Sequence, residues 1–465
     1  MRERLAEALA GGGDSDELLE LRWIDKSFRS VTVTNGRVER VTTRRRGGVG
    51  VRVRAGGAWG FAAAGDPSPA GLRAAIAAAR GSARVAASFR GAPGPALGPA
   101  RLARGDYGAP GVAEARARPL EALVALAVAA EAAARAADPG LASASATVSE
   151  IGERRAVCTS DGADATWGWC RPELQIQAVR AGPHGRVTGA EAVGVTGGFA
   201  ELLAVPAEER ARRAVETARA LATAAPPEGG RHTVILAPDL VGLLVHEAIG
   251  HTVEADFVLS GSAARGRLGQ TVASPLVTLR DVGPADGAGG WIPVDDEGVE
   301  AQDTPIIENG VLVGYLHNRE TAAHFGVAPT GNARAWEHAD PPLVRMRNTC
   351  IDAGRADLEA LIADTADGFL LVGAENGQAD STAEFSFGVR LARRIRGGRL
   401  AEVVRGVTVT GDAFAVLGSV DAVTDRFAWD LGSGHCGKGQ PARVDAGGPW
   451  LRCTALLAGA QAGEA

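Results

Sequence analysis

Near the middle of the chain stands the stretch His246-Glu247-Ala248-Ile249-Gly250-His251, which reads H-E-A-I-G-H inside an apolar run. Two imidazoles with a carboxylate beside the first are the residue types that zinc-dependent hydrolysis requires. Neutral imidazole nitrogens ligate the metal, and the glutamate takes a proton from metal-bound water. The alternative interpretation is a surface helical turn that happens to carry two unrelated histidines.

The spacing of the two histidines is unusual for a metal site. In the common H-E-x-x-H motif the ligands are four residues apart, about 40° around a regular helix, so both face one ion. Here they are five apart, about 140° around a regular helix, which no single ion can bridge. The sequence therefore predicts a local under-winding or break. A π-turn would restore the alignment, and Gly250 would tolerate the departure.

The residues before the motif indicate that it is buried. Residues 239–245 follow Pro238 and are apolar on most sides, as in a helix enclosed by a protein core. Histidine and glutamate side chains at the end of such a helix need polar partners, because an unpaired buried polar group is costly. A metal ion would satisfy all of them, which favours the metal site over the surface turn.

A tetrahedral zinc site needs a third protein ligand, and the residues alone leave it open. Glu254 lies three residues beyond His251 and could face the same way. His435 and Cys436 stand far downstream in the glycine-rich segment 432–440, where Lys438 could lower the pKa of the thiol. Glu254 and Cys436 are comparable candidates and His435 is a weaker one. The ordinary alternative for Cys436 is a small buried apolar residue.

The remaining pattern predicts an α+β fold in two domains. Residues 1–228 form an N-terminal mixed α/β domain with antiparallel strands and long helices, and residues 229–465 form a C-terminal β-rich domain carrying the metal-site helix. Asn35-Gly36 predicts a tight hairpin turn. The expected N-terminal strands cover 23–29, 30–34, 38–43, 49–55, 59–63, 143–151, 154–159 and 164–181, and the helices 69–80, 119–136 and 207–224. The expected C-terminal strands cover 232–237, 276–281, 304–308, 311–318, 383–395, 399–404 and 407–410, with a helix at 357–365.

Composition argues against several classes of protein. The net charge of −6 is spread over interspersed acids and bases, so we expect no nucleic-acid partner. Five cysteines without a C-x-x-C pair favour a reducing compartment. The N-terminus lacks the apolar region of a signal peptide, and charges interrupt the longest alanine-leucine stretch, 120–137. We therefore expect a cytoplasmic protein without a membrane partner.

The motif and its distant partner together resemble a known family. The sequence H-E-A-I-G-H-T-V-E-A-D at 246–256, followed by C-G-K-G-Q at 436–440, is similar to the TldD/PmbA family of metallopeptidases, specifically its TldD-type active subunits. Weaker similarities occur in family order from about residue 20 to residue 451. They include 49–53 with 60–62, 295–298, 307–310 with 314–315, 331–334, 346–349 and 377–380.

The resemblance implies roles for individual residues. It makes His246, His251 and Cys436 the ligands of one Zn²⁺ per chain and Glu247 the general base. Glu254 would hold His251 in the tautomer that binds metal.

Asn332 and Arg334 belong to a segment of the chain that resembles the family pattern G-N-x-R. They become candidates for gripping the backbone of a peptide substrate.

The expected function is zinc-dependent hydrolysis of small or unfolded peptides inside a dimer cavity. The resemblance implies either a PmbA/TldE-like partner subunit, which lacks the H-E-x-x-x-H residues, or a homodimer. Two alternatives remain: a non-catalytic assembly subunit of such a complex, and a zinc amidohydrolase acting on a non-peptide amide. The intact Glu247 argues against the assembly subunit, because a structural zinc site needs no base. Peptide turnover and leader-peptide removal are both compatible with the sequence.

Overall fold

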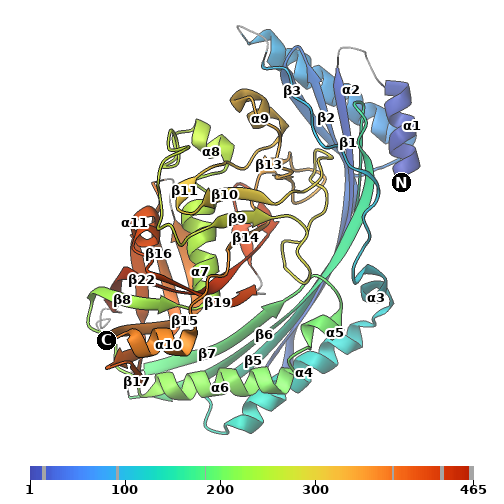
Figure 1. Cartoon of the computed structure of the whole chain (residues 1–465). Helices are drawn as coiled ribbons and strands as arrows, with labels where there is room; N and C mark the ends of the chain where they lie inside the picture. Colours follow the sequence, from blue (N-terminus) through green and yellow to red (C-terminus); the bar gives the residue numbers. More distant parts are fainter. Residues whose placement is uncertain (13–16, 91–93, 184, 380–381, 430–433, 460–465) are drawn as a thin grey trace.

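The computed structural model describes residues 1–12, 17–90, 94–183, 185–379, 382–429 and 434–459. Helices and strands are mixed throughout, and the predicted α+β class is confirmed. Two large β-sheets dominate. The N-terminal sheet, which has the longer strands, curves around one side of the C-terminal elements (Figure 1).

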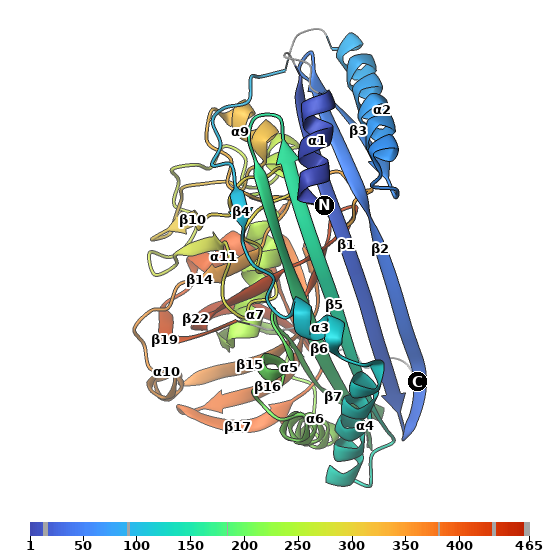
Figure 2. The same cartoon turned by 90° about the vertical axis from the view of Figure 1, so that its right-hand side faces the viewer.

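The N-terminal sheet is built from very long strands. Within the described residues its seven strands run in the order β3-β2-β1-β5-β6-β4, with β7 paired to β6. Neighbours are antiparallel except β4 and β6, and Figure 2 shows β1, β2 and β5 running along most of the molecule. The elements are α1 (Arg2–Gly12), β1 (Leu18–Thr34), β2 (Arg37–Ala55), β3 (Ala58–Ala64), α2 (Pro69–Ser88), β4 (Arg104–Asp106), α3 (Val112–Ala117), α4 (Leu120–Ala137), β5 (Ser143–Thr159), β6 (Asp164–Gly182), β7 (Gly185–Gly194), α5 (Phe199–Leu202) and α6 (Ala207–Ala222).

The hairpin turn predicted between β1 and β2 is present. Asn35 and Gly36 both adopt left-handed backbone conformations, with φ of 48° and 74°, as a tight hairpin of the favoured hand requires. The strands on either side are continuous, whereas the sequence predicted them in pieces. The reason is visible in β2, where residues 37–47 are almost all exposed. The two predicted pieces, 38–43 and 49–55, are separated by Arg44 to Gly48, which include no apolar side chain and so give no alternating pattern.

Two helix layers cover the ends of this sheet. Helices α1 and α2 pack their apolar faces on β1, β2 and β3, while α4 and α6 pack on β5, β6 and β7 at the other end. Helix α2 continues to Ser88, past the predicted end at residue 80, and Ala83 in that stretch is fully buried. A Cβ on Gly81 would meet no atom within 4 Å, so this glycine does not mark a helix end.

The C-terminal sheet is mixed and partly closed. Its described strands run β11-β10-β9-β14-β22-β18-β16-β15-β8, with β17 on β16 and β19 on β22. A further pairing of β22 with β8 closes a ring through β15, β16 and β18. The elements are β8 (Gly230–Leu236), α7 (Pro238–Leu244), η1 (Val245–Gly250), α8 (Ala255–Leu259), β9 (Leu279–Val282), β10 (Thr304–Glu308), β11 (Val311–Leu312), α9 (Arg319–Phe325), β12 (Ala333–Arg334), β13 (Leu343–Val344), β14 (Asn348–Ile351), α10 (Leu358–Asp364), β15 (Asp367–Ala379), β16 (Glu384–Arg396), β17 (Arg399–Val404), β18 (Val407–Asp412), α11 (Ala413–Gly418), β19 (Ala422–Trp429), β20 (His435–Gly437), β21 (Pro441–Arg443) and β22 (Asp445–Gly459).

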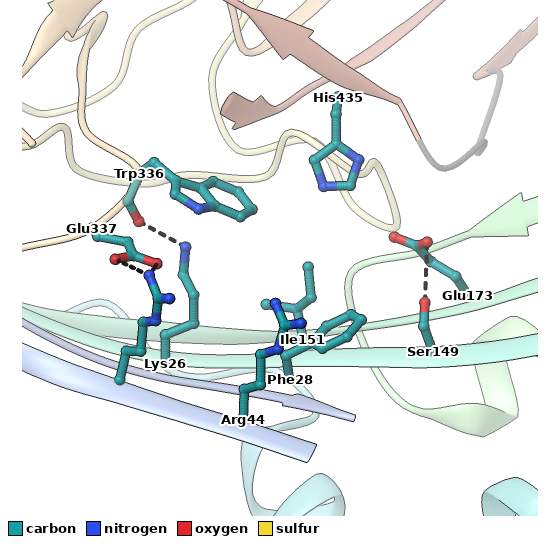
Figure 3. Close-up of a pocket in the computed structure, with 10 residues that line it drawn as sticks. Lys26, Phe28, Arg44, Ser149, Ile151, Glu173, Trp336, Glu337 and His435 are labelled. Carbon is teal, nitrogen blue, oxygen red and sulfur yellow. Dashed lines mark hydrogen bonds and ion pairs between the residues drawn. The ribbon is translucent and has the colours of Figure 1, made fainter. Parts of the chain in front are cut away.

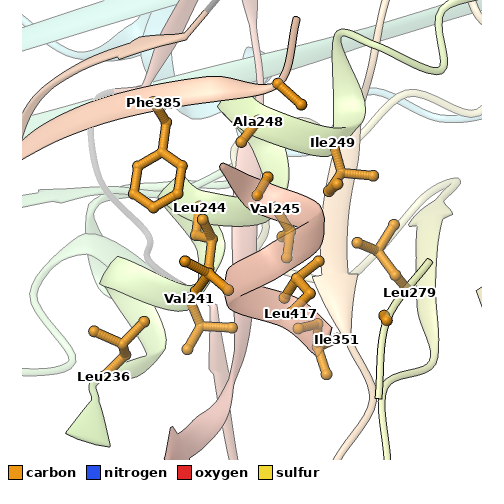
Figure 4. Close-up of a cluster of buried hydrophobic side chains, with 14 of the residues drawn as sticks. Leu236, Val241, Leu244, Val245, Ala248, Ile249, Leu279, Ile351, Phe385 and Leu417 are labelled. Carbon is orange, nitrogen blue, oxygen red and sulfur yellow. The ribbon is translucent and has the colours of Figure 1, made fainter. Parts of the chain in front are cut away.

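The helix that carries the motif is enclosed by this sheet, as its apolar sequence predicts. Leu240, Val241, Leu244 and Val245 are fully buried, and Figure 4 shows the last three packed among side chains from β16, α11 and β14. The rigid core therefore fixes the position of the histidines that follow.

Strand β22 was missed because it contains Gly447-Gly448-Pro449, which looks like a turn. The glycines serve close packing instead. A Cβ on Gly447 would lie 2.5 Å from the Ala428 carbonyl oxygen, and one on Gly448 would lie 2.7 Å from Val241 Cγ1 of α7.

The predicted strand at 311–318 was too long, since β11 ends at Leu312. The chain then turns inward at Gly314, whose Cβ would lie 2.6 Å from the Pro305 carbonyl oxygen. Tyr315 donates a hydrogen bond from its hydroxyl to the Ala264 carbonyl oxygen at 2.7 Å. The tyrosine anchors the loop before α9.

Buried ion pairs join the N-terminal sheet to the C-terminal loops. Arg155 on β5 donates hydrogen bonds to both carboxylate oxygens of Asp296 at 2.6 Å. It also forms an ion pair with Glu153 at 3.1 Å. All three side chains are almost fully buried. The predicted boundary between residues 228 and 229 stays a prediction. In the parts of the chain that the structure describes, no helix is both long and apolar enough to cross a membrane.

Candidate metal centre

The motif runs through a π-helix that ends at Gly250, directly before His251, as the five-residue spacing predicts. Helix α7 passes into η1, a π-helical turn over Val245–Gly250. The wider turn brings His246 and His251 onto the same side, with ring centroids 5.3 Å apart and ring planes at 81°. The two imidazoles therefore converge, which a straight α-helix would prevent.

Gly250 is needed for a different reason from the one the sequence suggested. It is absent from the glycines with left-handed φ angles, so its backbone requires no special freedom. A Cβ at this position would instead lie 1.9 Å from Met346 Sδ. The glycine leaves room for Met346, which packs directly against the π-turn.

Cys436 joins the two histidines. It lies in the middle of β20, which pairs with β21 in a short hairpin, and its Sγ is 3.0 Å from His251 Nε2. One ligand atom from each of His246, His251 and Cys436 lies within 4.8 Å of the others. Tetrahedral zinc with bonds of about 2.0–2.3 Å would place its ligand atoms about 3.3–3.8 Å apart, so the cluster has the right size.

The histidine environment also fits a metal ion. His246 is 4% exposed, and neither of its ring nitrogens has a hydrogen-bond partner among the described residues. An orphaned buried imidazole is costly, and a nitrogen, nitrogen, sulfur donor set suits zinc. The ligand roles themselves stay a prediction.

The charges at the cluster favour a thiolate. Burial alone would raise the pKa of the Cys436 thiol, but the His246 and His251 imidazoles lower it to about 4. Burial would likewise lower the pKa of His251, while hydrogen bonds with Cys436 and Glu254 raise it to about 10. The thiol is thus ready to act as an anionic ligand at neutral pH.

Glu254 lies behind His251 rather than among the converging atoms. Its Oε2 is 3.2 Å from His251 Nδ1 and also accepts a hydrogen bond from Lys438 Nζ at 2.9 Å. Lys438 additionally donates to Asp256 Oδ1 at 2.7 Å and to the Val344 carbonyl oxygen. The lysine therefore ties the loop after β20 to these carboxylates, whereas the groups that do most to lower the pKa of Cys436 are the imidazoles of His246 and His251.

The hairpin of Cys436 is held by an arginine that sequence reasoning missed. Arg345 is almost fully buried and donates to the carbonyl oxygens of Cys436 and Gln440, both at 2.7 Å. It immediately precedes Met346, the residue packed on the π-turn. Its position directly before the family-like segment 346–349 does not reveal this role.

The side chains of Asn332 and Arg334 form hydrogen bonds with other residues inside the protein. Asn332 is fully buried and donates to Asp281 Oδ2 at 2.7 Å and to the Arg345 carbonyl oxygen at 2.9 Å. Arg334 donates to the carbonyl oxygens of Met346 and Arg443. Neither lines the cleft beside the motif. This packing favours a structural role over contact with a substrate.

Glu247 faces an open cleft of about 750 Å³. Its Oε2 lies 3.8 Å from His251 Nε2, and its side chain keeps 23% exposure. The cleft is also lined by His251, His435 and Gly437 and by residues 377–379, 384–386 and 410. Among the weaker third-ligand candidates, His435 lines this cleft and approaches Arg443 at 3.5 Å. Gly432 and Ser433, and Asp380 of the family-like segments, lie outside the described residues.

Comparison with known proteins gives the family. Models of three PmbA/TldA metallopeptidase domains match the chain: domain 1 over residues 19–83, the central domain over 114–222 and the C-terminal domain over 229–458. A metalloprotease of Methanothermobacter thermautotrophicus is 34% identical over 454 residues, 96% of each chain. A zinc metalloprotease TldD homolog of Saccharolobus solfataricus is 34% identical over 235 residues, 50% of this chain and 52% of the relative.

Solved structures share the fold. A protein of Thermotoga maritima described as a putative modulator of a DNA gyrase has a TM-score of 0.78 at 20% identity, over 98% of this chain and 99% of the other. TldE from Thermococcus kodakarensis has a TM-score of 0.76 at 18% identity, with the same coverage. With its sequence relatives named as metalloproteases, the chain belongs to the PmbA/TldD family of metallopeptidases.

Proposed function

We propose that this chain is a zinc-dependent metallopeptidase that hydrolyses small or unfolded peptides. One observation carries the proposal: the π-turn aims His246 and His251 at Cys436, while Glu247, one residue along, faces an open cleft. A structural metal site would need neither the carboxylate nor the cleft. The relatives named as metalloproteases support the same conclusion.

The proposed mechanism assigns each side chain one task. His246, His251 and Cys436 would hold a single zinc ion, which would polarise the scissile carbonyl and lower the pKa of the attacking water. Glu247 takes the proton from that water and then delivers it to the leaving amine nitrogen. Glu254 accepts a hydrogen bond from His251 Nδ1, leaving the Nε2 lone pair directed at the centre.

The surroundings support an extended peptide as the substrate. The cleft lies at the paired ends of β15 and β16, where residues 377–379 and 384–386 line it. We propose that the chain works as a dimer that encloses this cleft, with a PmbA/TldE-like subunit or with itself. Access would then be limited to small or unfolded polypeptides. A thiolate ligand suits the reducing cytoplasm.

The deciding experiment replaces the proposed base. Glu247→Gln should keep about one zinc per chain and lower peptide hydrolysis on the order of 10²–10⁴-fold. Glu308→Gln, an exposed control at the end of β10, should keep full activity. Metal analysis and a peptide-cleavage assay, each with and without a co-expressed PmbA-like partner, give the readouts.

Two results would redirect the proposal. Near-normal hydrolysis by the Glu247→Gln protein would remove the role of this residue. A zinc-loaded wild-type protein that cleaves no peptide in either setting would point to the assembly subunit or to hydrolysis of a non-peptide amide.

A further inference from the structure

A second hollow of about 340 Å³ lies between the N-terminal sheet and the loops of the C-terminal part. Figure 3 shows Phe28, Arg44 and Ile151 on the sheet side, with Trp336 and His435 opposite. Its walls combine three apolar side chains with several charged ones. The mechanism above uses none of these residues.

The charged groups around this hollow are paired, with one exception. Lys26 Nζ lies 2.8 Å from Glu153 and 3.3 Å from the centre of the Trp336 ring. Arg46 pairs with both carboxylate oxygens of Glu337 at 3.1 Å.

Glu173 is likewise occupied, because Arg443 and Ser149 both bind its carboxylate. Arg44 makes no hydrogen bond or ion pair with any described residue, and its guanidinium reaches toward the ring of Phe28 and the side chain of Ile151 (Figure 3). The hollow therefore offers one unpaired positive charge beside an apolar wall.

This combination selects a type of ligand. A guanidinium forms bidentate hydrogen bonds with a carboxylate, and the aromatic and aliphatic walls favour an apolar group next to it. A cationic ligand would meet only carboxylates that already have partners.

The hollow is connected to the proposed active site through β20. His435 lines both the hollow and the cleft of Glu247, and it directly precedes Cys436. Because one side chain lines both spaces, a peptide chain lying in the cleft can extend past His435 into the hollow.

We propose that this hollow is a specificity subsite that binds a carboxylate of the peptide substrate through Arg44. The proposal rests on the peptidase function proposed above. Two sources provide the same chemistry: the C-terminal carboxylate of a short peptide and an acidic side chain.

Binding to the zinc-loaded Glu247→Gln protein tests the subsite without turnover. The probes are N-acetylated alanine-rich peptides of three to six residues in three forms: a free acid ending in phenylalanine, the matching amide, and an amide ending in glutamate. Calorimetry should show at least one carboxylate form binding about five- to tenfold more tightly than the phenylalanine amide. The tighter of the two carboxylate forms identifies the source.

Arg44→Gln in the same background should abolish this preference, and Arg44→Lys should keep part of it. Arg40→Gln is the matched control, because Arg40 is exposed on the same face of β2 four residues away, opposite Thr32 rather than Phe28. It should keep the preference. Equal affinities for all three peptides, or equal losses in Arg40→Gln and Arg44→Gln, would overturn the subsite.

The two proposals fail separately. Discrimination between the peptides without cleavage by the wild-type protein would remove the peptidase function and leave the subsite standing. Cleavage without discrimination would remove only the subsite.

Discussion

At the scale of single residues, the candidate centre works by placing each charge beside an opposite one. Cys436 faces two imidazoles, and His251 lies between the thiol and Glu254. Lys438 offsets the carboxylates of Glu254 and Asp256 on the outer side. The polar groups around the thiol thus favour its ionised form.

We predict that Cys436 is a thiolate in the metal-free protein at mildly acidic pH. Its pKa is lowered to about 4, so the charged form persists above that value and is lost as the pH falls through it. After chelator treatment, thiolate absorbance at pH 5 should match one sulfur per chain and should vanish in Cys436→Ser. The other four cysteines have raised pKa values because they are buried, and they provide the internal control. No absorbance until about pH 8 would contradict the electrostatic account.

At the scale of elements, the π-turn depends on what packs against it. Met346 occupies the space that a side chain at residue 250 would need, and Arg345, its neighbour, holds the Cys436 hairpin. One short segment before β14 therefore supports both halves of the ligand set.

We predict that Gly250→Ala weakens zinc binding and costs about 1–3 kcal/mol of stability through overpacking. The clash involves a side chain and not a left-handed backbone. Adding Met346→Ala to Gly250→Ala should therefore restore much of the zinc binding and of the stability that Gly250→Ala loses. Zinc titration and urea unfolding of the wild type, the two single variants and the double variant form a double-mutant cycle that measures this coupling. Additive losses in the double variant would show that the backbone, and not Met346, requires the glycine.

The irregular turn of the motif helix could be predicted from the sequence, but the distant residues that contact it could not. Five-residue spacing alone required an irregular turn at residues 246–251, and the structure has one. Cys436 lies 185 positions from His251, and no local pattern distinguishes it from Glu254; family resemblance made that choice. Arg345 was not predictable, because its role depends on which carbonyl groups the fold places around it. Strand β2 was predicted in two pieces, 38–43 and 49–55, because the residues between them, Arg44 to Gly48, include no apolar side chain that would mark a strand.

At the scale of the whole molecule, buried charges join the N-terminal sheet to the loops of the C-terminal part. Arg155 bridges Glu153 and Asp296, and it also donates to the Ala335 carbonyl oxygen at 2.9 Å. Asp296 accepts from the backbone N–H of Ala335. The loop that carries Trp336, a wall of the second hollow, is thus fixed to the N-terminal sheet.

We predict that Arg155→Met lowers the free energy of unfolding by about 3–5 kcal/mol, because the buried carboxylates of Glu153 and Asp296 both lose a cationic partner and keep only the pairs with Lys26 and Arg22 among the described residues. Urea denaturation measures the loss. Arg154→Met, which changes the exposed neighbour on the same strand, should stay within about 0.5 kcal/mol of the wild type. Equal effects of the two substitutions would mean that the buried pairs contribute no specific stabilisation.

Strand β20 is only three residues long, and its alternation separates two tasks that stand side by side in the chain. Cys436 is buried among the proposed ligands, while His435 and Gly437 are exposed to the cleft. Changes at 435 and 437 therefore alter the wall that a substrate meets without altering the donor atoms. Libraries of variants at residues 435 and 437 alone would therefore change the substrate preference and keep the proposed metal ligands.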